Sequence, residues 1–177
     1  MAAKTLVDDE RWGDFIERYA FDLTLFTLEV CDMSPTPQQV ELFNNVSKPG
    51  SRTSVRSGHG TGKSRSIGVA VLWHLLCYYL SNTMITAPKI EQVRNVSWKE
   101  ITDLQGIIRN GPHAWIADYF TVEAERVYII GFKPIPSPKN QTLLVCILPI
   151  SAASKMLSFI KKSGYPLKAG QFKSNSQ

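Results

Sequence analysis

The pattern of apolar and polar positions divides much of the chain into helical segments and short apolar runs. Between residues 66 and 80 most positions are apolar, which is typical of a mostly buried helix. From residue 89 to residue 108 apolar side chains recur at helical spacing, and this predicts a second helix. Four short segments rich in β-branched or apolar residues are expected to form strands: residues 53–56, 82–88, 121–132 and 142–150. Residues 121–132 are expected to form either a strand or a hairpin.

A glycine-rich stretch connects the first expected strand to the first expected helix. It matches the usual phosphate-loop pattern except at its first position, where Ser replaces Gly. Glycines let backbone N–H groups approach phosphate oxygens, the lysine supplies a positive charge, and the final serine hydroxyl is a ligand for Mg²⁺. We therefore expect a nucleotide-binding loop, with Ser64 as the Mg²⁺ ligand, formed by Ser57, Gly58, His59, Gly60, Thr61, Gly62, Lys63 and Ser64. The alternative is a glycine-rich surface turn before an ordinary helix.

A second candidate for the nucleotide site lies upstream, in the Pro-Thr-Pro-Gln-Gln sequence at residues 35–39. The amide of Gln39 offers both a donor and an acceptor, so it can pair with the N6 and N7 edge of adenine. The same sequence also suits a helix start, with Thr36 as the N-cap and Pro37 at the first helical position. The two interpretations are compatible.

Together these motifs resemble the N-terminal ATPase region of phage and prophage terminase large subunits, the motors that package DNA into capsids. The resemblance extends from residue 26 to about residue 131 and is carried by residues 35–39, 56–64, 86–92 and 111–120. It implies an ATPase core related to helicase motors, with Gln39 at the adenine, the loop around the phosphates, and ATP and Mg²⁺ as cofactors. It also implies double-stranded phage DNA, a small subunit and a portal as partners, no membrane, and the cytoplasm of a bacterial host cell as the location.

The expected fold is therefore α/β: a P-loop NTPase built as a partial three-layer α/β sandwich, with a largely parallel sheet that starts from the loop strand. Residues 1–132 would be the N-terminal part of this ATPase domain. The family also stabilises the transferring phosphoryl group with a basic side chain near the loop. The candidates for that role are Arg56, His59 and Arg65, and Lys89 and Arg94 are either DNA contacts or solvated surface charges.

After about residue 132 the chain departs from the terminase pattern. A P-loop ATPase needs a strand that ends in an Asp to hold Mg²⁺ and a Glu to activate water. The last carboxylate side chain of this sequence is Glu125, and the earlier apolar stretch that ends in Asp118 has no Glu after it. The carboxylates of the family's nuclease domain are absent too, so whether the chain hydrolyses ATP stays open. Residues 133–177, with a short helix expected at 152–162, are interpreted as a divergent basic tail, disordered or frame-shifted, of a truncated gene product.

The charge is distributed unevenly along the chain. Residues 1–50 carry a net charge of −5 and residues 51–177 a net charge of +10, and the segment from Lys133 onward holds seven lysines without any Asp or Glu. This segment either binds a phosphate backbone through its lysines or is a disordered tail that the lysines keep soluble. The longest apolar run is too short to span a membrane, and the three cysteines and three histidines show no zinc-ligand spacing.

Three functions remain compatible with the sequence. The chain is the ATP-binding portion of a terminase large subunit, a helicase-like DNA-dependent ATPase, or a non-enzymatic remnant of a packaging motor. A strand with paired acids would favour the second, whereas weak nucleotide binding and rapid proteolysis of residues 133–177 would favour the third.

Overall fold

The computed structural model describes residues 5–48, 51, 53–55, 58, 60–78, 81–86, 91, 93–123, 126–130 and 142–146, with the side chains of all except residues 82, 86, 94, 96 and 142–146. The chain divides into two compact units, Met1–Cys146 and Ile147–Gln177, and every described residue belongs to the first. The helix expected at residues 152–162 therefore lies outside the described residues, and the domain boundary at residue 132 stays a prediction.

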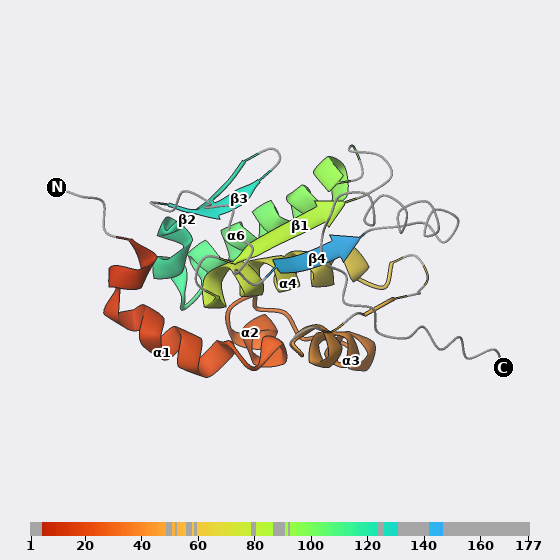
Figure 1. Ribbon diagram of the computed structural model, residues 1–177, viewed down its shortest axis with the longest axis horizontal. Helices are drawn as coiled ribbons and strands as arrows, with labels where there is room; N and C mark the ends of the chain where they lie inside the picture. The colour runs from red at the N-terminus through yellow and green to blue at the C-terminus, as the bar shows by residue number, and fades with distance from the viewer. Residues whose placement is uncertain are drawn as a thin grey trace. The chain divides into compact units, whose positions relative to one another are not determined.

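The described part of the first unit is built mainly from helices (Figure 1). Among the described residues, three α-helices precede the glycine-rich loop, one begins at its end, and another follows the first strand. In chain order the elements are the 3₁₀ helix η1 (Leu6–Asp8), α1 (Glu10–Tyr19), α2 (Leu23–Glu29), α3 (Pro37–Val46), α4 (Lys63–Cys77), β1 (Asn82–Thr86), the π-helix η2 (Val93–Trp98), α6 (Lys99–Asn110), the 3₁₀ helix η3 (Ala114–Asp118), β2 (Phe120–Val122), β3 (Val127–Ile129) and β4 (Thr142–Cys146).

The helices before the loop begin at side-chain caps. Asp9 accepts a hydrogen bond from the backbone N–H of Arg11 at the start of α1, and Asp22 accepts one from Leu25 at the start of α2. Such caps satisfy N–H groups that have no partner inside the helix. At the start of α3, Thr36 and Gln39 form a reciprocal capping box with Pro37 at the first helical position, which confirms the expected helix start.

The central helix is α4, which contacts α1, α2, α3 and α6. Ten of its fifteen residues are buried, because apolar side chains surround most of its circumference. The indole N–H of Trp73 ties it to the end of α1 by donating to the carbonyl oxygen of Tyr19 at 2.8 Å. The helix predicted over residues 66–80 is thus confirmed, with its start three residues earlier, at Lys63.

The hydrophobic core lies where α4 meets its neighbours. On α6 the buried residues Ile101, Leu104 and Ile108 follow the helical spacing that the sequence showed, so the predicted second helix is present with its regular part over Lys99–Asn110. Aromatic and leucine side chains from the other helices complete the core, and the largest fully buried ones include Tyr19, Phe26, Phe43, Leu23, Leu72 and Leu76.

The described strands pair in two separate sheets. β1 and β4 run parallel, with Asn82 opposite Thr142 and Thr86 opposite Cys146. β2 and β3 form an antiparallel hairpin. The strands predicted at residues 82–88 and 142–150 and the hairpin predicted at 121–132 are confirmed within the described residues.

The expected fold class is wrong. We expected a P-loop NTPase fold, a partial three-layer α/β sandwich with a largely parallel sheet, but the described residues are mostly helical and their strands form only two two-stranded sheets. The strand that was to start the sheet is not formed over residues 53–55. Thr53, Ser54 and Val55 lie exposed in irregular backbone, whereas strands of parallel sheets are buried on both faces.

Candidate functional site

The glycine-rich loop ends at the first residue of the central helix. Gly60 and Gly62 adopt left-handed backbone conformations, with φ angles of 75° and 73°, and Gly62 is the N-cap of α4. Residues with a Cβ rarely adopt this conformation, so the turn into the helix depends on glycine. Gly62 has no side chain that could cap the helix. The N-terminus of a helix favours an anion through its backbone N–H groups and its dipole.

Lys63, the first residue of α4, bends back over the loop. Its Nζ donates hydrogen bonds to the carbonyl oxygen of Gly58 and, at 3.3 Å, to the Thr61 hydroxyl. The same hydroxyl donates to the carbonyl oxygen of Gly58 at 3.2 Å. A positive charge therefore lies at the loop, next to the positive end of the α4 dipole.

The loop has open space on the side of its earlier glycines. Among the described residues, apart from the neighbours along the chain, no heavy atom lies within 4 Å of a Cβ atom placed on Gly58 or Gly60, and both residues are exposed. A Cβ on Gly62 would instead lie 2.7 Å from Nε2 of Gln39. Phosphate oxygens could thus approach the backbone at Gly58 and Gly60, so this part of the loop fits a polyphosphate.

Gln39 lies beside the loop although it is 23 positions before Gly62 in the sequence. Its Nε2 donates to the hydroxyl of Ser66 at 3.0 Å, and its Oε1 accepts from the backbone N–H of Thr36 at 2.9 Å. The structure therefore brings together the two motifs that the sequence left unconnected. Ser66 was not among the expected site residues, since a serine inside an apolar helix gives no sequence signal of its own.

Ser64, the residue expected to ligate Mg²⁺, lies at the end of the loop. Ser64 is the second residue of α4 and is partly exposed. Among the described residues, no group of three or more His, Cys, Asp or Glu side chains could hold a metal ion. A Mg²⁺ ion at this site would therefore depend on Ser64, phosphate oxygens and water, which are ligands that Mg²⁺ accepts.

Arg65 forms an ion pair with a residue outside the loop. Its guanidinium donates to Glu100, in the first turn of α6, at 3.1 Å, and both side chains are partly buried. Of the other expected residues, Ser57, His59, Arg56 and Lys89 lie outside the described residues, and the side chain of Arg94 is not described. The role of a phosphate-stabilising basic residue therefore stays a prediction.

The apolar stretch that ends in Asp118, which the sequence placed before the expected strand at residues 142–150, is not a strand. Residues Ala114–Asp118 form the 3₁₀ helix η3, and the side chain of Asp118 is 79% exposed and 3.9 Å from Arg109. A Mg²⁺-holding Asp lies at the end of a buried strand in P-loop ATPases, so this geometry agrees with leaving Asp118 out of the site.

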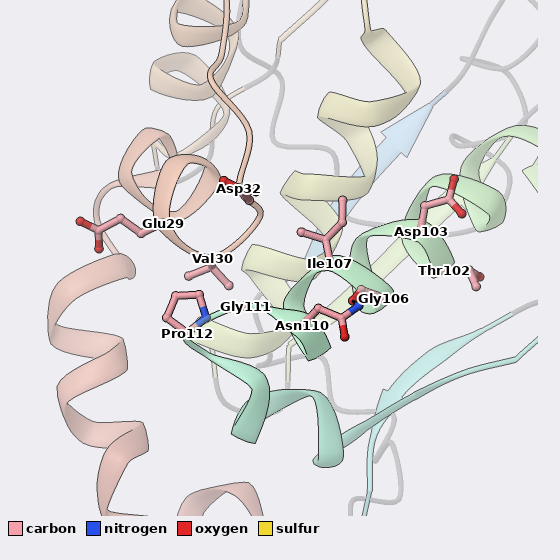
Figure 2. Close-up of a pocket in the computed structure, with 10 residues that line it drawn as sticks. All are labelled: Glu29, Val30, Asp32, Thr102, Asp103, Gly106, Ile107, Asn110, Gly111 and Pro112. Atoms are coloured by element: carbon pink, nitrogen blue, oxygen red, sulfur yellow. Dashed lines mark hydrogen bonds between the residues drawn. The ribbon is translucent and has the colours of Figure 1, made fainter.

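A pocket of about 790 Å³ lies apart from the loop, between the end of α2 and one side of α6 (Figure 2). Its lining residues are Glu29, Val30, Asp32, Thr102, Asp103, Gly106, Ile107, Asn110, Gly111 and Pro112. Glu29 is held by Arg18 through two hydrogen bonds of 2.7 and 2.6 Å, and it also accepts a bond from the Tyr19 hydroxyl. These donors lower the pKa of Glu29 to about 2, so its carboxylate stays charged and belongs to the contact between α1 and α2.

Comparison with known proteins relates the chain to a phage protein. It is 29% identical over 119 residues to a protein of Enterobacteria phage P7 described as "Probable terminase, large subunit", and the match covers 67% of this chain. The chain spans 24% of the length of that relative. No protein-family model matches the chain, and no solved structure matches it. This similarity supports the relation to a terminase large subunit that the sequence motifs indicated, whereas the assignment to the N-terminal ATPase region and the truncation stay predictions.

Within the described part of the chain, no helix has both the length and the apolar character needed to cross a membrane.

Proposed function

We propose that the chain binds the triphosphate of ATP, together with Mg²⁺, through residues 58–64, as part of the large subunit of a phage DNA-packaging motor. The relation to a probable terminase large subunit supports the motor, and the loop geometry supports the ATP site. Because the chain spans 24% of that relative, double-stranded DNA, a small subunit and a portal are proposed as partners of the whole motor.

One observation carries the ATP proposal. Two left-handed glycines lead directly into the N-terminus of the central helix, and the first residue of that helix is a lysine whose ammonium group lies over the loop backbone. Backbone donors, a helix dipole and a point charge thus converge where the phosphates would bind. In this proposal Lys63 contacts the β- and γ-phosphates, Ser64 ligates Mg²⁺, and Gln39 lies at the side of the base.

The proposal covers binding of the nucleotide and makes no claim about its hydrolysis. β4, which pairs with β1, contains no Asp or Glu, and the sequence has no carboxylate side chain after Glu125. Without a Glu the attacking water is neither oriented nor deprotonated. We therefore propose nucleotide binding for this chain and assign no catalytic residue.

Thermal unfolding with and without Mg-ATP tests the proposal. At a concentration about 100 times the dissociation constant, a ligand of the folded state stabilises it by about 2.7 kcal/mol. For a chain of this size that corresponds to a rise in the melting temperature of roughly 5–10 °C. The substitution Lys63→Ala should abolish this rise, whereas Lys48→Ala, which removes an exposed lysine after α3, should leave it unchanged.

If Mg-ATP stabilises the Lys63→Ala protein as much as the parent, the nucleotide binds elsewhere and the proposed site is wrong. An unchanged melting temperature in the parent would contradict ATP binding itself.

A further inference from the structure

A chain of hydrogen bonds connects the start of α3 to the end of the glycine-rich loop. The backbone N–H of Thr36 donates to Oε1 of Gln39 at 2.9 Å, and Nε2 of Gln39 donates to the Ser66 hydroxyl at 3.0 Å. The Ser66 hydroxyl in turn donates to the carbonyl oxygen of Gly62 at 3.0 Å. Each acceptor along this series of hydrogen bonds belongs to the next residue toward the loop.

We propose that Gln39 is a positioning residue for the phosphate loop, which it orients through Ser66, whether or not a base is bound. The inference rests on the proposed function, because it assumes that the loop binds phosphate. It adds to the sequence-based expectation, in which Gln39 pairs with adenine.

Two hydrogen bonds from Ser66 orient the peptide between Gly62 and Lys63. The carbonyl oxygen of Gly62 accepts from the Ser66 backbone N–H at 2.9 Å as well as from the Ser66 hydroxyl. A peptide group is planar, so fixing the direction of this C=O also fixes the direction of the Lys63 N–H on its opposite side. That N–H is the first one of α4, at the place where an anion would bind.

Gln39 also packs closely against Gly62. The amide nitrogen of Gln39 lies 2.7 Å from the position that a Cβ of Gly62 would occupy. Gln39 therefore lies directly against the left-handed turn that directs the chain into the helix, and it limits the positions that this turn can adopt. Ser66 is 1% exposed, so water does not compete for the hydroxyl that transmits the contact.

The hydrogen bonds to Ser66 and Thr36 leave Gln39 able to contact a base. A glutamine amide has two N–H donors and an oxygen with two lone pairs. The bonds to Ser66 and Thr36 use one N–H and one lone pair. A base could pair with the remaining donor and acceptor without breaking the hydrogen bonds to Ser66 and Thr36. Base contact and loop orientation would then be linked through one side chain.

Inorganic tripolyphosphate separates the two roles, because it carries the phosphates of ATP without a base. The experiment is calorimetric titration of tripolyphosphate and of ATP into the parent and into Gln39→Ala, Ser66→Ala and the double variant. One lost hydrogen bond of ordinary net strength corresponds to about a five-fold change in affinity. We expect each single substitution to weaken tripolyphosphate binding about five-fold, and the double substitution to weaken it no further.

Two controls make the result specific. Gln38→Ala removes the neighbouring exposed glutamine of α3 and should leave tripolyphosphate affinity unchanged. Ser66→Ala keeps the capping box between Thr36 and Gln39, so α3 remains capped in that variant. In Ser66→Ala the ratio of ATP to tripolyphosphate affinity should stay at the parent value, whereas Gln39→Ala should also lower this ratio.

The outcomes distinguish this inference from the proposed function. If the parent binds tripolyphosphate and Gln39→Ala binds it equally well, the positioning role is wrong while the phosphate site stands. If the affinity losses of the two single variants multiply in the double variant, Gln39 does not act through Ser66. If the parent binds neither ligand, the proposed function fails, and this inference fails with it.

Discussion

At the scale of single residues, Gly62 carries the most constraints in the candidate site. It is the N-cap of α4, its φ angle is 73°, and the amide of Gln39 occupies the space of a Cβ. Gly13, an exposed residue inside α1, has none of these constraints. Among the described residues outside its own stretch of helix backbone, no heavy atom lies within 4 Å of an added Cβ. The two glycines therefore form a matched pair for substitution by alanine.

We expect Gly62→Ala to destabilise the protein and Gly13→Ala to stabilise it. A left-handed conformation costs a residue with a Cβ about 1–2 kcal/mol, and the contact with Gln39 adds to this cost. Alanine in place of glycine inside a helix gains about 0.5–1 kcal/mol. Urea unfolding of both variants measures the difference, and a Gly62→Ala protein as stable as the parent would contradict the left-handed turn.

At the scale of elements, a buried histidine joins the central helix to the first strand. His74 of α4 is 5% exposed, and its Nδ1 lies 2.8 Å from the hydroxyl of Thr83 in β1. Burial disfavours the charged imidazolium and lowers the pKa of His74 to about 4. The packing of α4 against β1 is therefore coupled to the protonation state of this side chain.

Acidification should weaken this contact well above the pH at which carboxylates titrate. Because the pKa of His74 is lower in the folded state than in the unfolded state, its contribution is fully present above about pH 6.5 and is lost as the pH falls toward 4. Between pH 7.5 and pH 5 the expected loss in the free energy of unfolding is about 2 kcal/mol.

Urea unfolding at the two pH values, with His74→Gln as the comparison, measures this loss. His113 also has a pKa lowered by burial and adds a loss of the same sign, so the variant should keep only that part. Asp9 and Glu29, whose pKa values are lowered by their hydrogen bonds to arginine, act only at lower pH. An equal pH dependence in parent and variant would show that His74 is not buried in its neutral form.

At the scale of the whole molecule, the sequence predicted elements better than it predicted their assembly. The buried helix α4, the hairpin of β2 and β3 and the strands β1 and β4 follow from local patterns of apolar residues, and all are present. The fold class was wrong because it required residues 53–55 to pair as a strand of a larger parallel sheet. Pairing depends on contacts between distant segments, and those three side chains are exposed instead.

Only part of the candidate site could be predicted from the sequence, because some of its contacts also join distant segments. Glycines in left-handed turns and a lysine at a helix start can be inferred from residue type and order, as at Gly60, Gly62 and Lys63. The contact of Gln39 with Ser66 could not, because it depends on how α3 packs against α4. Arg65 was a candidate at the loop by its position alone, and its pairing with Glu100 depends on the packing of α6.

The central claim, that the loop at the start of α4 binds a triphosphate, is tested most directly by locating the ligand. Backbone amide signals in nitrogen–proton correlation spectra can be followed during a titration with Mg-ATP. The amides of Gly60, Gly62 and Lys63 should shift most, and those lining the pocket between α2 and α6 should stay in place. Shifts confined to that pocket, or spread over the protein without a maximum at the loop, would contradict the account.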